Sequence, residues 1–180
     1  MERLIKNIDV LDENAEALIY STNIMLNCTG GVGACLAVRY GRHVQKELHD
    51  LLNVRGSRFA SQGEVFEHVC SGMPYRKLFH TVPCDAMYNT SPEIVEDILH
   101  RCLRQCAVDG IEKVSMSVLA TGYGHLDFED FFRIADRVVN NDDYKEIERI
   151  VICIADLSLY EQALELIKRE KLRLEPKEGE

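Results

Sequence analysis

The sequence predicts an α/β fold with a largely parallel sheet. Short apolar runs with the period of strands alternate with longer stretches of helical period, which is the pattern of βαβ units. The chain has 180 residues, 46% of them hydrophobic, which is enough for one well-filled core and short for two. We therefore expect a single domain over residues 1–170, followed by a charged tail, 171–180, that frays.

Five segments are expected to form strands. Residues 17–20 and 150–154 are continuous apolar runs, as in the buried strands of a parallel sheet. Residues 64–70, 77–82 and 113–119 alternate between apolar and polar side chains, which is typical of strands. A turn at the glycine and proline of residues 72–74 can join segments 64–70 and 77–82 as a hairpin.

Four segments are expected to form helices. Residues 33–52 carry apolar side chains on one face. A second helix should run from Ser91 to Gly110, with the serine hydroxyl accepting free N–H groups and a proline at its first position. Asp127 should cap a third helix, and Ser158 with Glu161 forms the capping box of a fourth.

The charge and hydropathy of the chain limit its partners. The net charge is −9 and the isoelectric point is about 5.2, the wrong sign for a protein that grips duplex nucleic acid through its phosphates. No window approaches the roughly 18–20 apolar residues of a membrane span, and residues 1–6 lack the apolar core of a signal peptide. We expect a cytoplasmic protein that binds neither duplex nucleic acid nor a membrane.

The seven cysteines are odd in number and include no CxxC pair, which favours reduced thiols. Cys102 and Cys106 stand four residues apart on a predicted helix, a spacing that can place two thiolates on one face for a metal. They also share the apolar stripe of that helix, where free cysteine acts as a small buried hydrophobe. We expect the buried role, and we expect neither a metal nor a cofactor.

Two glycine-bearing loops each follow a predicted strand and precede a predicted helix. Residues 23–34 include Gly30, Gly31 and Gly33, which allow the backbone to approach an anion at the start of a helix. The loop lacks the Lys-Ser/Thr of a Walker motif and the spacing of the dinucleotide fingerprint, and alone it is equally compatible with a tight connection. Residues 120–125 form the second loop. In an open α/β sheet both loops can close over one ligand at the carboxyl ends of the strands.

In order and spacing, these segments resemble the pattern of the macro domain family over roughly residues 4–170. The matching segments are Asp9-Val10, Ala17-Leu18-Ile19-Tyr20-Ser21-Thr22-Asn23, Gly30-Gly31-Val32, Gly63-Glu64-Val65, Phe79-His80-Thr81-Val82-Pro83 and Thr121-Gly122-Tyr123-Gly124. The resemblance implies a three-layer α/β/α sandwich with a mixed, largely parallel sheet. It also implies a cleft for ADP-ribose or a related nucleotide, either free or attached to a protein.

The resemblance also implies roles for individual residues. Asp9 would accept a hydrogen bond from the adenine amino group beside the Val10 amide, and Asn23 would bind the distal ribose. The remaining positions would hold the phosphates and the sugar from two sides, and they are Gly30, Gly31, Val32, Gly33 and Ala34 in the first loop and Ala120, Thr121, Gly122, Tyr123 and Gly124 in the second. Each side chain has a plainer alternative: Asp9 as an exposed loop carboxylate, Asn23 as a cap of the strand end, and Tyr123 as a core tyrosine.

The sequence departs from the family pattern where catalysis would matter. Gly33 stands where hydrolytic macro domains of the best-known type carry an acid after Gly-Gly-Val, so the carboxylate that would activate water is missing. Tyr20 replaces a common asparagine, and Ala155 lies near the position of an aromatic residue that stacks on adenine. His125 is a weak candidate for acid or base work near neutral pH, with a simple turn-capping role as the alternative. A nucleophilic Cys28 or Cys35 is a further alternative.

Three functions remain open on the sequence. The first is a binding module for ADP-ribose or its derivatives. The second is a hydrolase of ADP-ribosyl bonds or of ADP-ribose 1″-phosphate, in which the substrate or His125 supplies the missing acid. The third is a scaffold whose cleft is blocked by Tyr20, Met25 or Tyr123 and which acts through protein partners.

Overall fold

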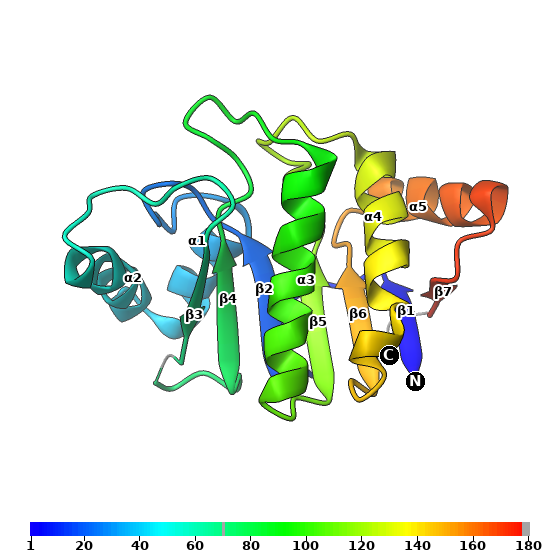
Figure 1. The fold of residues 1–180 in the computed structure, drawn as a ribbon, viewed down its shortest axis with the longest axis horizontal. Helices are drawn as coiled ribbons and strands as arrows, with labels where there is room; N and C mark the ends of the chain where they lie inside the picture. Colours follow the sequence, from blue (N-terminus) through cyan, green and yellow to red (C-terminus); the bar gives the residue numbers. More distant parts are fainter. Residues whose placement is uncertain (70, 178–180) are drawn as a thin grey trace.

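The computed structural model describes residues 1–69 and 71–177, and a seven-stranded sheet forms its centre (Figure 1). In chain order the strands are β1 (Glu2–Lys6), β2 (Ala17–Ser21), β3 (Val65–His68), β4 (Lys77–Thr81), β5 (Lys113–Ser117), β6 (Arg149–Cys153) and β7 (Glu175–Pro176). Their order across the sheet is β3-β4-β2-β5-β6-β1-β7. The hairpin partner β3 runs antiparallel to β4, and every other pair is parallel. The predicted mixed, largely parallel sheet is confirmed.

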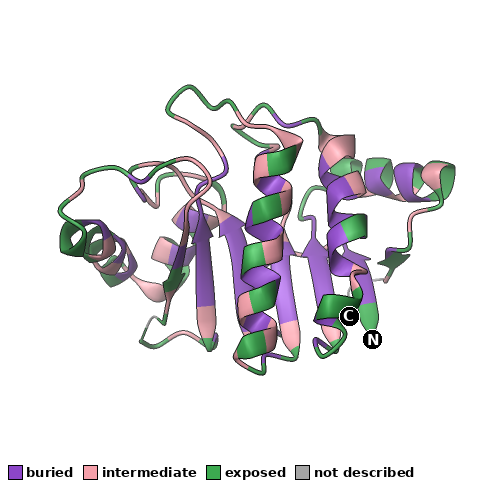
Figure 2. Ribbon diagram, viewed as in Figure 1, coloured by how far each residue is buried: buried purple, intermediate pink, exposed green. Residues whose placement is uncertain are grey.

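Successive side chains of the central strands pack on opposite faces of the sheet. In β2, Ala17 and Ile19 belong to one buried cluster, and Leu18 and Tyr20 belong to the other. Both faces are therefore covered, which is why the strand reads as an unbroken apolar run. Figure 2 shows the central strands buried along most of their length.

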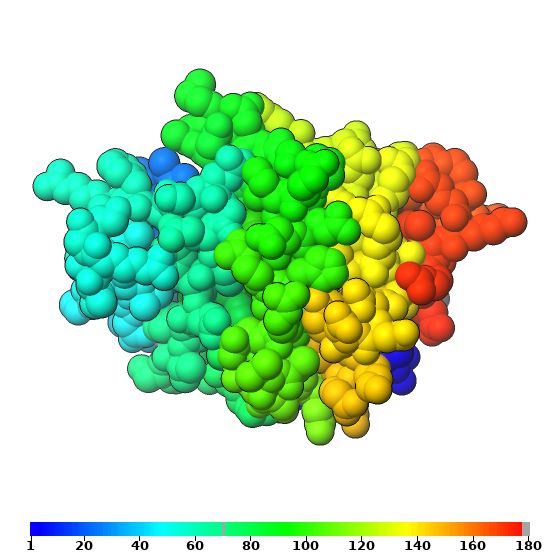
Figure 3. All heavy atoms as spheres, in the orientation of Figure 1, coloured from blue at the N-terminus to red at the C-terminus, as the bar shows by residue number. Residues whose placement is uncertain are grey.

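Helices form the two outer layers. They are α1 (Gly31–Tyr40), α2 (His43–Val54), α3 (Pro92–Val108), α4 (Phe128–Val139) and α5 (Leu157–Glu170), with a short 3₁₀ helix at Asp142–Tyr144. The buried side chains of α3, α4 and α5 pack in one cluster, and those of α1 and α2 pack in the other. Figure 3 shows α3 in green and α4 in yellow over the face turned to the viewer. The fold is the three-layer α/β/α sandwich that the sequence predicted.

The single helix predicted over residues 33–52 is wrong. The chain forms two helices because Gly41 adopts a φ of +105°, which a helix cannot contain and which side chains other than glycine rarely adopt. The second helix, α2, starts at His43 and packs its own apolar face through Val44, Leu48 and Leu52. After this break α2 does not continue along α1 and lies beyond the β3 edge of the sheet (Figure 1).

Two predicted caps are corrected and one is confirmed. Asp127 accepts hydrogen bonds from the amides of Glu129 and Asp130, as predicted. The last helix is capped by Asp156, which accepts from the amide of Leu159, so the capping box at Ser158 is wrong. Ser91 does precede α3, but its side chain makes no capping hydrogen bond.

The first strand, β1, was not predicted from the sequence because charged residues interrupt its apolar pattern. Arg3 is buried and donates to the carbonyl oxygens of Val139, Ile147 and Tyr144 at 2.6, 2.9 and 3.0 Å. Lys6 is also buried and pairs with Glu13 at 2.8 Å. Both cations find polar partners inside the fold, which removes most of the cost of burying them.

Part of the tail that was expected to fray packs against the sheet. Leu174 is buried, and Glu175–Pro176 pair with Leu4 and Ile5 of β1 as the edge strand β7. The rest of that tail, residues 178–180, lies outside the described residues. None of the described helices is long and apolar enough to cross a membrane.

Candidate functional site

A cavity of about 670 Å³ lies at the carboxyl ends of β2, β4 and β5. These three strands are parallel neighbours, so the loops that follow them meet at one edge of the sheet, where open α/β folds bind ligands. The lining residues are 21–25, 27, 29–33, 83–86, 88, 117, 118, 120 and 122–124. The two loops that the sequence singled out therefore do line one cavity, together with a third segment.

The first loop is held in shape by its own amide side chain. Asn23 accepts hydrogen bonds from the amides of Met25 and Asn27 at 3.1 Å each and donates to the carbonyl of Asn27 at 2.8 Å. From α2, Gln45 accepts from the amide of Cys28 at 2.6 Å and donates to the carbonyl of Leu26 at 2.8 Å. Asn23 lines the cavity, and its contact with a ribose stays a prediction.

The second loop reaches across to the first. A Cβ atom at Gly30 would lie 3.1 Å from Cε2 of Tyr123, so the tyrosine ring depends on glycine at that position for its close approach. A Cβ atom at Gly124 would lie 2.6 Å from Sγ of Cys84 and would collide with the carbonyl of Ala120. At the base of the loop the amide of Ala120 donates to the hydroxyl of Ser21 at 3.1 Å.

The third wall of the cavity was not predicted from the sequence. The cavity is also lined by a segment that follows β4, which comprises Pro83, Cys84, Asp85, Ala86 and Tyr88. The signal was present, because β4 is a predicted strand and a proline, a carboxylate and an aromatic residue follow its end. Figure 1 shows this segment, in green, beside the second loop, in yellow-green.

Four of the predicted ligand residues do not line the cavity. Val10 is buried in the core, and Asp9 accepts a hydrogen bond from the amide of Leu11 at 2.9 Å, which closes a turn. Ala34 and Thr121 lie next to lining residues without contributing to the wall. The cavity thus comprises the predicted phosphate and distal-ribose end, and the predicted adenine end lies beyond it.

The candidates for acid–base or nucleophilic chemistry are poorly placed. His125 is exposed and outside the cavity lining, and its amide donates to the carbonyl of Tyr88 at 3.1 Å. Burial raises the pKa of the Cys28 thiol, and that of Cys84 rises to about 11, so both stay protonated near neutral pH. Cys35 is exposed and does not line the cavity.

The position of the missing acid is crowded. A Cβ atom at Gly33 would lie 3.3 Å from the backbone Cα of Cys28, so a carboxylate there would require the first loop to shift. The two cysteines four residues apart do not form a metal site. Cys102 and Cys106 are buried in the core cluster, as expected of small hydrophobes. Within residues 1–69 and 71–177, no group of three His, Cys, Asp or Glu side chains is arranged to hold a metal ion.

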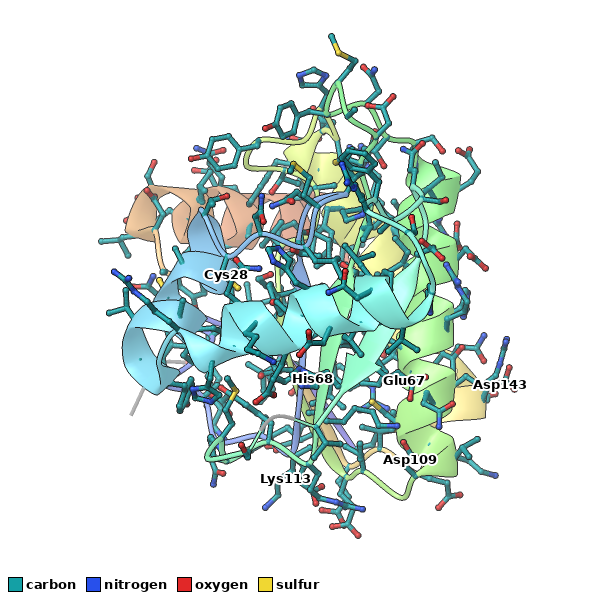
Figure 4. All side chains as sticks on the ribbon, turned by 90° about the vertical axis from the view of Figure 1, so that its left-hand side faces the viewer. Cys28, Glu67, His68, Asp109, Lys113 and Asp143 are labelled. Carbon is teal, nitrogen blue, oxygen red and sulfur yellow. The ribbon has the colours of Figure 1, made fainter. Side chains whose placement is uncertain are left out.

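Beneath the first loop a line of polar side chains runs from the core to the surface. Tyr20 contacts His80 at 2.5 Å, His80 contacts His68 at 3.3 Å, and His68 contacts Glu47 of α2 at 2.8 Å. Figure 4 shows His68 beside α2. The Tyr20 ring also lies under the first loop, 3.7 Å from the Cβ position of Gly33. Tyr20 therefore supports the floor and does not block the cavity.

Comparison with known proteins agrees with this architecture. The macro domain family model matches residues 19–135. A mutant of the Oceanobacillus iheyensis macrodomain, solved with ADPR, superposes with a TM-score of 0.77 at 20% identity, covering 93% of this chain and 92% of that one. The Trypanosoma brucei macrodomain in complex with ADP-ribose gives a TM-score of 0.72 at 15% identity over 91% of this chain and 68% of that one. No curated protein matches the chain. The family model covers more than half of the sequence, and the chain belongs to the macro domain family.

Proposed function

We propose that this protein binds ADP-ribose or an ADP-ribose derivative, either free or attached to a protein. The observation that carries the proposal is the single cavity built by the loops after β2, β4 and β5. Its volume of about 670 Å³ falls in the range of small-molecule sites. Two solved structures of similar fold hold ADP-ribose, which supports the same ligand here.

The start of α1 supplies the groups that would bind the pyrophosphate. The helix begins at Gly31, and its N-cap, Gly30, has no side chain to occupy the free amides of the first turn. Such amides and the positive end of the helix dipole form an anion site. No lysine or arginine is present among the described residues that line the cavity, so backbone amides would bind the phosphates.

The remaining contacts follow from position. Gly30, Gly31, Val32 and Gly33 would hold one side of the phosphates, and Ala120, Gly122, Tyr123 and Gly124 the other. Asn23 would contact the distal ribose with the amide hydrogen that its loop bonds leave over. Asp9 and Val10 would receive the adenine beyond the cavity, and Ala34 and Thr121 would support the two loops from behind.

The hydrolytic alternative gains no support from the residues that surround the cavity. Gly33 supplies no acid, a side chain there would be crowded by Cys28, and His125 lies outside the cavity wall. The blocked-scaffold alternative loses its motivation because Tyr20 lies below the floor and the cavity is open beside Met25 and Tyr123. Binding is therefore the function we propose.

Calorimetric titration of ADP-ribose tests the proposal. Saturable binding to the wild-type chain is expected, with weaker binding to Asp9→Ala if that carboxylate receives the adenine. Asp143→Ala, which changes an exposed carboxylate of the 3₁₀ helix far from the cavity, should bind like wild type. An absence of binding to the folded wild-type protein would rule out ADP-ribose itself as the ligand. Equal binding to all three proteins would refute only the adenine contact.

A further inference from the structure

The wall after β4 brings a negative charge into a cavity otherwise suited to anions. Asp85 is the one charged side chain among the described residues that line it. A ligand that carries only phosphate charges would gain nothing from a carboxylate at this place and would be repelled by it. A ligand with a positive group near Asp85 would be attracted.

The carboxylate is fixed in its ionised form. Its Oδ1 atom accepts from the amides of Met87 and Asn89 at 2.8 and 2.9 Å, and Oδ2 accepts from the side-chain amide of Asn89 at 3.2 Å. These bonds, chiefly those from Asn89, lower the pKa of Asp85 below its ordinary value. The charge is therefore present throughout the neutral range.

Two tyrosines line the same cavity as Asp85. Tyr88, three residues after Asp85, and Tyr123 of the second loop have ring centroids 6.2 Å apart, with their planes inclined at 38°. Both line the cavity, and their side chains remain 49% and 76% exposed, so their faces are open to a ligand. Aromatic faces attract cations, and planar ones also stack on them.

The backbone holds this group of residues in place. Tyr88 has a φ of +64°, a conformation that bulky residues rarely adopt and that is often found at functional sites. The amide of Tyr88 donates to the carbonyl of Asp85 at 3.1 Å, and its own carbonyl accepts from the amide of His125 at 3.1 Å. The segment after β4 is thereby tied to the loop that carries Tyr123.

We infer that the cleft recognises ADP-ribose derivatives whose distal ribose carries a planar cation, and that Asp85, Tyr88 and Tyr123 receive that cation. The inference rests on the proposed function and narrows its ligand class. The shared chemistry is a flat, positively charged group bonded to the anomeric carbon. It has two natural sources, the pyridinium ring of an oxidised nicotinamide dinucleotide and the guanidinium of an ADP-ribosylated guanidine.

Titration with four ligands at one ionic strength tests this inference on the wild-type protein. The ligands are ADP-ribose, oxidised nicotinamide adenine dinucleotide, its reduced form, and ADP-ribosyl-guanidine. The reduced dinucleotide is the matched control, because its ring has nearly the same size and lacks the charge. At least one cationic ligand should bind about five- to tenfold more tightly than the reduced dinucleotide, in line with a cation held by aromatic faces and a carboxylate. The tighter of the two cationic ligands identifies the source.

Substitutions test whether the Asp85 carboxylate causes the preference for a cationic ligand. Asp85→Asn keeps an oxygen acceptor for the turn and removes the charge, so it should abolish the preference for the cation while ADP-ribose binds as well as before or better. Tyr88→Leu should reduce the same preference. Asp143→Asn, far from the cavity, should leave it unchanged.

The possible outcomes distinguish a failure of the cation preference from a failure of the proposed function. If ADP-ribose binds and the charged and reduced ligands bind equally, or if Asp85→Asn preserves the preference, the inference is wrong and the proposed function stands. If a cationic ligand binds selectively while ADP-ribose does not, the inference stands and the proposed function narrows to ADP-ribose derivatives. If none of the four ligands binds, both are overturned.

Discussion

The phenolic oxygen of Tyr20 lies 2.5 Å from Nδ1 of His80, and both side chains are fully buried. Burial and the neighbouring His68 lower the pKa of His80 to about 3, so its ring is neutral at neutral pH. One arrangement of protons then satisfies the whole line. Tyr20 donates to Nδ1 of His80, Nε2 of His80 donates to His68, and His68 donates to Glu47.

Removing the tyrosine hydroxyl should destabilise the fold. Tyr20→Phe keeps the ring and leaves a buried acceptor on His80 without its donor, which costs about 1–3 kcal/mol of unfolding free energy. Urea denaturation followed by circular dichroism measures the loss. Tyr123→Phe, at an exposed ring, should change the stability by less than about 0.5 kcal/mol. A Tyr20→Phe protein as stable as wild type would show that the hydrogen bond contributes nothing.

Acid should weaken the fold through His80. Because its folded pKa of about 3 lies below the ordinary value of 6.5, the unfolded chain takes up a proton between these limits and the folded chain does not. The contribution of His80 is thus constant above about pH 6.5. Below it the contribution falls with a limiting slope of about 1.4 kcal/mol per pH unit.

Urea midpoints measured from about pH 7.5 down to about pH 5 test this dependence. His80→Gln, which retains one donor and one acceptor, should be less stable at neutral pH and should lose this part of the slope. His43→Gln, at an exposed histidine, should retain it. A slope that is the same with and without His80 would contradict the assignment.

A methyl group at Gly124 should impair ligand binding, whereas one at Gly122 should not. The new atom at Gly124 would collide with the carbonyl of Ala120 and with Sγ of Cys84, forcing the second loop to move. Nothing lies within 4 Å of the Cβ position of Gly122. In calorimetry Gly124→Ala should weaken the binding of ADP-ribose about tenfold or more, which corresponds to a loss of about 1.4 kcal/mol in binding free energy. Gly122→Ala should stay within about twofold of wild type, and similar effects of the two substitutions would argue against a packed second loop.

The buried guanidinium of Arg3 should be essential for stability. Its burial lowers its pKa to about 10, and it still satisfies three carbonyl oxygens that end α4 and lead into β6. Arg3→Met keeps an apolar stem and leaves these acceptors unpaired, with an expected loss of roughly 2–4 kcal/mol in thermal or urea unfolding. Arg58→Met, at an exposed arginine, is the matched control and should differ from wild type by less than about 0.5 kcal/mol. A minor effect at Arg3 would mean that water replaces the guanidinium.

The central strands and the cap at Asp127 show what local pattern can predict. Residues 17–20 and 150–154 were expected as buried strands because a strand covered on both faces is apolar throughout, and they form β2 and β6. Asp127 was expected as a cap because its carboxylate needs only the amides two and three residues onward. Such features depend on neighbours in the chain, so the sequence contains them.

Features that depend on distant partners were missed or misjudged. Arg3 interrupts an apolar pattern, and it fits inside the fold only because carbonyls from residues 139, 144 and 147 are positioned around it. The tail was expected to fray because its pairing with β1 joins residues about 170 positions apart. Asp85 was overlooked because its place in the cavity depends on the parallel pairing of β4 with β2.

The sequence by itself determined the α/β class, the family resemblance and the two glycine loops, since periodicity, glycine spacing and motif order are properties of the chain. Only the tertiary structure decided that the two loops and the segment after β4 share one cavity, that a side chain at Gly33 would be crowded by Cys28, and that Asp85, Tyr88 and Tyr123 line that cavity together. The physical reason is that a cavity is formed by surfaces from separate elements. The order of the strands across the sheet sets their distances.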